Sequence, residues 1–481
     1  MSWEQDTPYI SRRSLLKRSA CGFGYMALAG LAQQTAAREM RNPLEPKLPH
    51  FAARAKRVIF LFMTGGPAHM DTFDYKPLLQ RDAGKTLPFA IPKLQQLQKR
   101  DLGKLLASPF RFAQYGQGGI WISELFPTLA KHADKLCLVN GMHTEGVDHS
   151  QATLRLHTGA GAFIRPSIGS WVVYGLGTEN DSLPGMVTIC PHPDSGGVRN
   201  YSSAFLPAIC QGTPIGTSRT SAHQAKIRHI ENQRIPARLQ QLQQELRARR
   251  NRERMQVDSG DAQMEGVIQS FELAFRMQAA SPRIMDITNE SPATLKLYGI
   301  GEGPSDEFGL QCLMARRLAE AGVRYIQITH TDKTHGNSWD QHSNLKKELV
   351  ANAEQIDRPI AGLLADLEAR GLLDDTLVWW GGEFGRTPAA QGADLATVGR
   401  DHNPFGFTMW LAGGGVRGGM SYGATDDYGY YAAQNKVHMH DMHATILHLL
   451  GIDHTRLTYR YAGRDFRLTD VYGNVVHDVL S

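Results

Sequence analysis

The chain contains several short and almost wholly apolar runs, each of which stops at a turn rich in Gly, Pro or polar residues. The clearest are residues 57–63, 136–139, 324–328, 376–380 and 407–411. Such runs are typical of strands that are buried on both faces. Stretches with helical spacing separate them, such as residues 344–370 before Gly371. The alternation predicts an α/β fold with a mainly parallel central sheet flanked by helices.

The organisation of the chain favours one large domain. A length of 481 residues would allow two or three domains, but the predicted strands recur throughout, so we expect a single domain over residues 51–481. Residues 225–278 are rich in Gln, Arg and Glu and are predicted to form a helical insertion with a solvated, charged face. The net charge of +5 includes this segment, and no base-reading motif accompanies it, so we expect no nucleic acid partner.

The N-terminus has the form of an export signal. Ser11-Arg-Arg-Ser-Leu-Leu-Lys17 resembles a twin-arginine motif, and the weakly apolar stretch after it, residues 20–32, is too short to span a bilayer. We expect a signal peptide over residues 1–37, recognition by the twin-arginine export machinery and a periplasmic or secreted protein without a stable membrane span. Export in the folded state suits a protein that acquires a metal first.

Ionisable side chains follow the predicted strands where these strands end. Because the carboxyl ends of parallel strands meet at one edge of a sheet, we expect such side chains to converge. Carboxylate and imidazole groups suit Zn, Mn or Fe better than Ca. The sequence therefore predicts a divalent metal site, and its candidate ligands are Asp71, Asp340, His342, Glu383 and His402.

Several motifs along the chain carry a resemblance to a known family. They include Gly65-Gly-Pro with Asp71-Thr-Phe-Asp74, Arg165-Pro-Ser-Ile-Gly169, Trp339-Asp-Gln-His342 and Glu383-Phe-Gly-Arg-Thr-Pro388. Through them, nearly the whole chain resembles the exported family called domain of unknown function 1501. More distantly, the order of the site residues is similar to that of the alkaline phosphatase and sulfatase superfamily, whose fold the resemblance implies here.

The superfamily resemblance implies a role for each candidate ligand. Asp71 matches the aspartate that binds metal after the first strand. Asp340 and His342 resemble an aspartate and a histidine that hold the other metal, although their spacing is narrower than is usual. His402, which stands before Asn-Pro, resembles a further histidine ligand.

Glu383 occupies the first position of a ligand pair whose second member is a histidine in the superfamily. Phe384 stands at that second position, so one of two metal positions loses a donor. The resemblance then implies either a single ion or a second site that is completed by His69 or His335.

The segment 148–159 resembles the superfamily helix that begins with a nucleophile, and it puts His149 at the nucleophile position. A helix N-terminus stabilises an anionic ester. Three roles stay open: direct attack through a phosphohistidine, metal binding or proton donation to the leaving group, and a remnant without catalysis. Arg386 is predicted either to clamp a phosphate or sulfate or to form a structural ion pair with Glu383 or Asp401.

These inferences favour an exported metal-dependent hydrolase of phosphate or sulfate esters, with one or two divalent ions. The expected substrate is an anionic ester, such as one linked to a glycan. The first alternative is a non-catalytic exported binding protein that keeps the fold and a metal. The second is a phosphomutase that uses a phosphohistidine. Catalysis itself stays open at this point.

Overall fold

The computed structural model describes residues 44–91, 103–228, 230, 234–257, 262–331, 337–392 and 394–481. The expected signal peptide, residues 1–37, lies outside them. Within the described residues, the main sheet has nine strands. In spatial order its path is β12 (Met420–Tyr422), β4 (Leu136–His143), β11 (Phe407–Ala412), β8 (Thr376–Gly381), β1 (Arg57–Met63), β7 (Tyr325–His330), β5 (Met186–Ile189) and β6 (Thr213–Ile215), and β15 (Val437–His438) pairs with β4.

The sheet is mainly parallel, as the sequence predicts. Strand β1 lies at its centre and runs parallel to β7 and β8, and β5 runs parallel to β7 and β6. Strand β11 is the exception, because it runs antiparallel to both β4 and β8. The C-terminal ends of β1, β7 and β8 therefore lie at one edge of the sheet, and the polar loops that follow these strands meet there.

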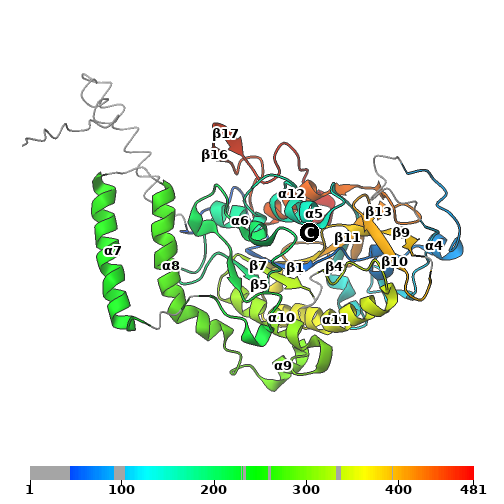
Figure 1. The fold of residues 1–481 in the computed structure, drawn as a ribbon, viewed down its shortest axis with the longest axis horizontal. Helices are drawn as coiled ribbons and strands as arrows, with labels where there is room; N and C mark the ends of the chain where they lie inside the picture. Colours follow the sequence, from blue (N-terminus) through cyan, green and yellow to red (C-terminus); the bar gives the residue numbers. More distant parts are fainter. Residues whose placement is uncertain are drawn as a thin grey trace, which may run out of the picture.

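Helices cover both faces of the sheet (Figure 1). Residues of β1 alternate between two cores. Ile59 and Leu61 pack in the core that holds α10 (Asp306–Glu320) and α11 (Leu345–Ala369). Phe60 packs in the other core, with α6 (Ile168–Leu176) and α12 (Met439–Leu449). Each fully buried side chain of this kind contributes about 1.5–3 kcal/mol, which explains why the strand is apolar at every position after Arg57.

Two helices lie where the insertion is expected. They are α7 (Ala237–Val257) and α8 (Ala262–Met285), and α7 stands outside α8 at the edge of the molecule (Figure 1). Leu239, Leu242 and Leu246 of α7 are 52%, 47% and 65% exposed, whereas Leu273 and Met277 of α8 are buried against the body. The more distant helix thus contributes little to the core.

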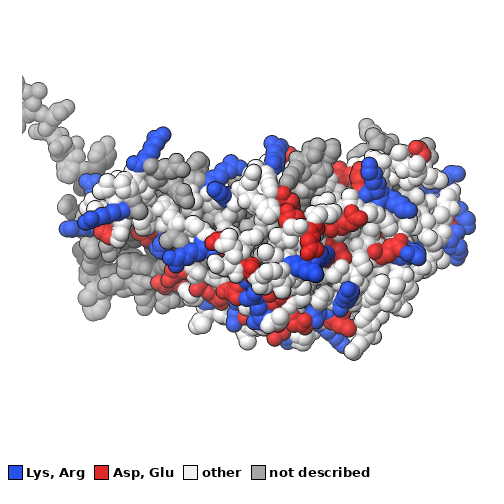
Figure 2. Space-filling model, turned by 90° about the horizontal axis from the view of Figure 1, so that it is seen from below, with Lys and Arg blue, Asp and Glu red and all other residues white. Residues whose placement is uncertain are grey.

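The remaining elements are short. They are α3 (His69–Thr72), α4 (Pro77–Arg81), α5 (His149–Thr158), α9 (Pro292–Tyr298) and the paired strands β2 (Phe112–Tyr115) and β3 (Ile120–Ser123), β9 (Gly385–Gln391) and β10 (Gly399–Asn403), β13 (Ala424–Thr425) and β14 (Ala432–Gln434), and β16 (Tyr459–Tyr461) and β17 (Arg464–Phe466). Of the helices in the described ranges, none is both long and apolar enough to cross a membrane. On the face that Figure 2 shows, basic and acidic side chains are interspersed.

The turn after β1 depends on glycine. Gly65 has a φ of +109°, and a Cβ atom at this position would lie 2.6 Å from the amide nitrogen of Asp340. The amide of Gly65 donates to both carboxylate oxygens of Glu383, at 3.0 and 3.2 Å. The turn therefore packs directly against two of the candidate ligands, and it has no room for a side chain.

We predict that Gly65→Ala lowers the free energy of unfolding by about 3 kcal/mol or more, because the left-handed backbone is strained and the new Cβ meets a neighbouring backbone. Gly84→Ala is the matched control. Gly84 also has a positive φ, of +81°, but a Cβ atom added there would meet no neighbouring atom within 4 Å, so backbone strain alone should cost about 1–2 kcal/mol. Urea denaturation measures both values, and equal losses would contradict the close packing at Gly65.

Candidate metal centre

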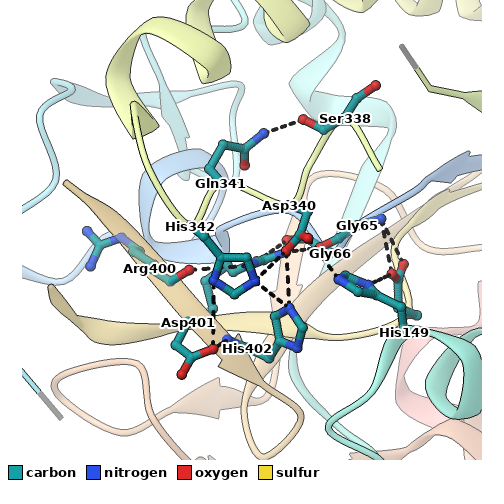
Figure 3. A network of polar contacts seen from close by, with 12 residues as sticks. Gly65, Gly66, His149, Ser338, Asp340, Gln341, His342, Arg400, Asp401 and His402 are labelled. Carbon is teal, nitrogen blue, oxygen red and sulfur yellow. Dashed lines mark hydrogen bonds and ion pairs between the residues drawn. The ribbon is translucent and has the colours of Figure 1, made fainter. Parts of the chain in front are cut away.

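Four side chains from three parts of the chain converge at the sheet edge (Figure 3). His149 is the first residue of α5, Asp340 and His342 follow β7, and His402 lies in β10. Each offers one donor atom, and these atoms all lie within 4.8 Å of one another. The group can hold a metal ion. His342 and His402 are therefore brought together with Asp340, as the sequence predicts, and His149 joins them.

Asp340 is the centre of this group. Its Oδ1 atom lies 3.0 Å from Nε2 of His342 and 3.1 Å from Nε2 of His402, and its Oδ2 atom lies 3.1 Å from Nε2 of His149. Arg386 also donates to Oδ1, at 2.6 Å. Burial raises the pKa of Asp340, but its contacts with His149, His342 and His402 and the charge of Arg386 outweigh burial and hold the pKa far below the ordinary value. The carboxylate is ionised across the physiological pH range.

The tautomers of His342 and His402 follow from their outer partners. Nδ1 of His402 lies 2.7 Å from the carbonyl oxygen of Val147, and Nδ1 of His342 lies 2.5 Å from Oε1 of Gln391. Both partners are acceptors, so each Nδ1 carries a proton, and in a neutral ring Nε2 then presents the lone pair. Burial lowers the pKa of His402, which keeps that ring neutral. Imidazoles that bind metals are usually oriented in this way.

The distances between the inner atoms fit a metal ion. The two Nε2 atoms of His342 and His402 lie 2.9 Å apart, and both face the carboxylate of Asp340. Ligands at about 2.0–2.2 Å from a metal are separated by about 2.8–3.6 Å when they subtend angles near 90–110°. When both rings are neutral, no proton lies between the two Nε2 lone pairs and the carboxylate of Asp340. A cation bound among these three acceptors would interact favourably with each of them.

His149 lies between two carboxylates. Its Nδ1 atom is 2.7 Å from Oε1 of Glu383, and its Nε2 atom faces Asp340. Burial alone lowers the pKa of His149, but hydrogen bonds to Asp340 and Glu383 and their charges outweigh it and raise the pKa to about 9. The ring is therefore an imidazolium at neutral pH when no metal is bound. Glu383, which is 1% exposed, holds it in place.

Asp71 lies outside the group of four. Its carboxylate forms a two-point ion pair with Arg400, at 2.7 and 3.1 Å, and both side chains are fully buried. The structure thus places the predicted ligand Asp71 with an arginine. Arg400 is a polar residue that the sequence analysis did not single out, since nothing in the sequence shows which acid a distant arginine will meet.

Arg386 is fully buried. Its Nε atom donates to the carbonyl oxygen of Gly66 at 3.0 Å, its Nη1 atom to that of Arg400 at 3.2 Å, and its Nη2 atom to Gly65 and Asp340. Of the two predicted roles, this geometry matches the structural ion pair, although its partner is Asp340. A clamp on a phosphate or sulfate would require the guanidinium to leave these acceptors.

Phe384 fills the space beside the group of four. Its ring centroid lies 5.0 Å from that of His149 and 4.6 Å from that of His402. His69, a candidate for completing a second site, is buried, and its Nε2 atom lies 2.8 Å from the carbonyl oxygen of Gly429. The other candidate, His335, lies outside the described residues.

Two further groups at the centre escaped the sequence analysis. Gln391 reaches His342 because β9 and β10 pair as a hairpin, with Gln391 opposite Gly399. The other group is the carbonyl of Val147, which carries no sequence signal because every residue has a carbonyl. The only sequence signal for the position of Gln391 is the short polar segment 385–403, whose two halves could pair as a hairpin.

We predict a pH dependence for the metal-free protein. Because the pKa of His149 rises from 6.5 to about 9 on folding, its charged form stabilises the fold fully below pH 6.5, and this contribution is lost as the pH rises through 9. After removal of metal with a chelator, urea denaturation from pH 6 to pH 10 should show the difference between the unaltered protein and His149→Gln shrinking over that window. If the difference in the free energy of unfolding between the two proteins did not change with pH, His149 would not be an imidazolium paired with Asp340 and Glu383.

The chain is similar to several solved structures at low sequence identity. The lipoteichoic acid synthase LtaP from Listeria monocytogenes shares 9% identity with a TM-score of 0.36, over 90% of this chain and 80% of that chain. The sulfatase PsFucS1 from Pseudoalteromonas sp. shares 10% identity with a TM-score of 0.35, over 89% and 71%. The alkaline phosphatase from the Antarctic bacterium TAB5 shares 10% identity with a TM-score of 0.32, over 77% and 94%.

Among curated proteins, none matches this sequence. A family model does match it, over residues 55–480, and is described as "Protein of unknown function (DUF1501)". The matched span includes β1 at its start and every candidate ligand. The chain therefore belongs to the DUF1501 family, which confirms the resemblance that its motifs carry.

Proposed function

We propose that this protein is a metal-dependent hydrolase of phosphate or sulfate esters, and that Asp340, His342 and His402 are its metal ligands. The observation that carries the proposal is the convergence of two imidazole Nε2 atoms on one partly buried carboxylate. A divalent ion bound by such ligands polarises an ester oxygen and lowers the pKa of a bound water to about 7. The mixed nitrogen and oxygen donors favour Zn, Mn or Fe over Ca.

His149 is the proposed proton donor to the leaving group. Its ring carries a proton on each nitrogen at neutral pH, because the pKa is raised to about 9. Glu383 holds Nδ1, so the proton on Nε2 is the one directed toward the centre. His149 also begins α5, where the positive end of the helix dipole stabilises an anionic ester.

Arg386 and Glu383 are proposed as positioning residues. Arg386 connects Oδ1 of Asp340 to the turn at Gly65 and Gly66, which fixes the direction of the carboxylate. Glu383 connects the same turn to His149. Both side chains are buried, and each holds a residue of the centre through a hydrogen bond.

The position of Phe384 favours one ion over two. In a two-metal site, donors from both sides would have to reach an ion about 3.5–4 Å from the first. Here an apolar ring lies against His149 and His402. The Arg400 ion pair also occupies both oxygens of Asp71. A second ion would therefore need a rearrangement of buried groups.

The same observations support a second candidate, a non-catalytic exported protein that binds metal. His149, the first residue of α5, has a carboxylate beside each ring nitrogen, so neither nitrogen is free to attack a substrate. The phosphomutase gains less support, because a phosphohistidine needs a free ring lone pair. For His149, this would require Nε2 to lose its proton and leave Asp340.

We predict that purified protein retains one divalent ion per chain and hydrolyses a phosphate or sulfate ester in a metal-dependent way. His402→Ala should lose both the ion and the activity, because a ligand is removed. His149→Ala should keep the ion but lose activity by about 100-fold or more, as expected for a proton donor. His223→Ala is a control, because His223 is partly exposed and pairs with Asp306, and neither residue belongs to the metal centre.

Elemental analysis gives the metal content, and a screen of phosphomonoesters, phosphodiesters and sulfate esters gives the activity. A bound ion without turnover on any ester class would contradict the hydrolase and favour the binding protein. Loss of the ion in His149→Ala would instead make His149 a fourth ligand, which would remove it as the proton donor.

We also propose that the protein is exported by the twin-arginine route to the periplasm or beyond. The motif Ser11-Arg-Arg-Ser-Leu-Leu-Lys17 supports this. We predict that residues 1–50 direct a folded fluorescent reporter out of the cytoplasm and that replacing Arg12 and Arg13 with Lys stops this export. Cell fractionation measures the share of each reporter fusion that leaves the cytoplasm. Equal export of the two fusions, or export in cells that lack the twin-arginine translocase, would contradict the route.

A further inference from the structure

We propose that a patch around the hairpin of β16 and β17 binds the surface of a membrane that contains anionic phospholipids. The patch consists of residues 163–165, which follow α5, and residues 461–466 of the hairpin. The hairpin projects from the body at the top of the view, above α6 (Figure 1). We call these two segments the hairpin patch. The inference goes beyond the proposed function and does not depend on it.

Contacts between guanidinium groups and aromatic rings join the two segments of the patch. The guanidinium of Arg165 lies 4.3 Å from the centroid of the Phe466 ring and 5.4 Å from that of the Phe163 ring. The guanidinium of Arg464 lies 4.8 Å from the same Phe466 centroid. Tyr461 pairs with Arg464 across the hairpin, and its ring centroid lies 6.4 Å from that of Phe466. Basic and apolar groups therefore lie side by side on one surface.

Large apolar side chains of the patch are exposed. Phe163 and Ile164 are neighbours in the chain and are 69% and 66% exposed, and Tyr461 is 45% exposed. Single apolar side chains on a surface are normal, whereas a group of them indicates an interaction site with a protein or a membrane. Their place on a loop and on a projecting hairpin allows them to enter a lipid layer ahead of the rest of the molecule. The tyrosine, with its apolar ring and polar hydroxyl, suits the boundary of that layer.

The charges of the patch suit anionic headgroups. Residues 459–470 contain two carboxylates, and each already pairs with an arginine, Asp465 with Arg460 and Asp470 with Arg464. Arg165 forms no hydrogen bond or ion pair within the described part of the chain. It is therefore an unmatched cation that two aromatic rings hold in place. A guanidinium presents its donors in a planar fork that matches the oxygens of a phosphate.

A phospholipid surface satisfies both kinds of group at once. Its phosphates lie at the level of the headgroups and its hydrocarbon lies just below them, so arginines can pair with phosphate while apolar side chains reach deeper. A soluble polyanion would leave Phe163 and Ile164 in water. An apolar protein surface would leave Arg165 without a counter-charge. The combination of groups thus favours an anionic membrane over these two partners.

The patch and the metal centre lie at opposite ends of α5. This helix of 10 residues begins with His149 and is about 15 Å long. Its C-cap, Gly159, packs against the carbonyl group of Leu468, which follows β17. Binding of lipid at the patch therefore does not use the metal ligands.

The test is sedimentation of the full-length protein with vesicles of phosphatidylglycerol and phosphatidylcholine. We expect binding that weakens as salt is added and that is much weaker to vesicles of phosphatidylcholine alone. Phe163→Ser should weaken binding about tenfold, because an apolar ring no longer enters the membrane. Arg165→Gln should weaken it about fivefold, as expected for the loss of one cation at the surface.

Leu395→Ser and Arg417→Gln are matched controls that should leave binding unchanged. Leu395 is 79% exposed and lies in the turn between β9 and β10. Arg417 is also exposed and lies between β11 and β12. Arg464→Gln provides a further variant of the patch if Arg165→Gln does not fold.

A local probe separates the patch from the N-terminus, whose apolar residues 20–32 could bind lipid independently. An environment-sensitive dye is attached at Ala462→Cys, in the turn of the hairpin, in a protein that also carries Cys21→Ser. The remaining cysteines are buried, and they are Cys137, Cys190, Cys210 and Cys312. We expect vesicles with phosphatidylglycerol to shift the dye fluorescence to the blue, and Phe163→Ser to reduce this shift.

An unchanged dye spectrum would overturn the inference, as would equal weakening of binding by Phe163→Ser and Leu395→Ser. Binding of dextran sulfate without binding of vesicles would identify a soluble polyanion as the partner and would also overturn it. The vesicle experiments use neither metal nor ester. Lipid binding without ester hydrolysis would therefore leave this inference standing and contradict only the hydrolase.

Discussion

The partly buried carboxylate of Asp340 is the group on which the rest of the site depends. One oxygen meets His342, His402 and Arg386, and the other meets His149. A buried charge is stable only when its neighbours compensate for the lost water. When the imidazoles of His342 and His402 are neutral, they offer lone pairs rather than protons, so Arg386 and the His149 imidazolium compensate alone until a cation binds. The arrangement therefore favours a metal ion, because an ion converts repulsion between acceptors into shared coordination.

The turn after β1 connects the groups around Asp340 to the central sheet. Gly65 donates to Glu383 and accepts from Arg386, so one residue connects the partner of His149 to the partner of Asp340. Its left-handed backbone allows this close approach. The centre is consequently tied to the turn after β1, a strand that is buried along its whole length. Such support keeps the donor atoms within the narrow range of distances that a metal requires.

Much of the fold could be predicted from the sequence, because buried parallel strands are apolar at every position and end at polar turns. The run 57–63 and the run 376–380 lie in β1 and β8. The site was less predictable. His342 and His402 could be placed together from the order of the strands, but Gln391 and the carbonyl of Val147 could not, since they depend on a hairpin and on a backbone atom. Asp71 shows the reverse case. A carboxylate after a first strand suits a metal, yet Arg400 reaches it from a distant strand.

The sequence by itself determined the α/β class, the family and the edge of the sheet where the polar residues collect. These properties follow from local composition, from the period of apolar residues and from motifs that neighbours along the chain define. Only the tertiary structure decided which acids face histidines and which face arginines. That choice depends on distances of a few ångströms between residues that are separated by tens to hundreds of positions, and electrostatic partners at that range leave no local pattern. The effect of Phe384 on the site could also be seen only in the folded chain, where its ring lies against His149 and His402.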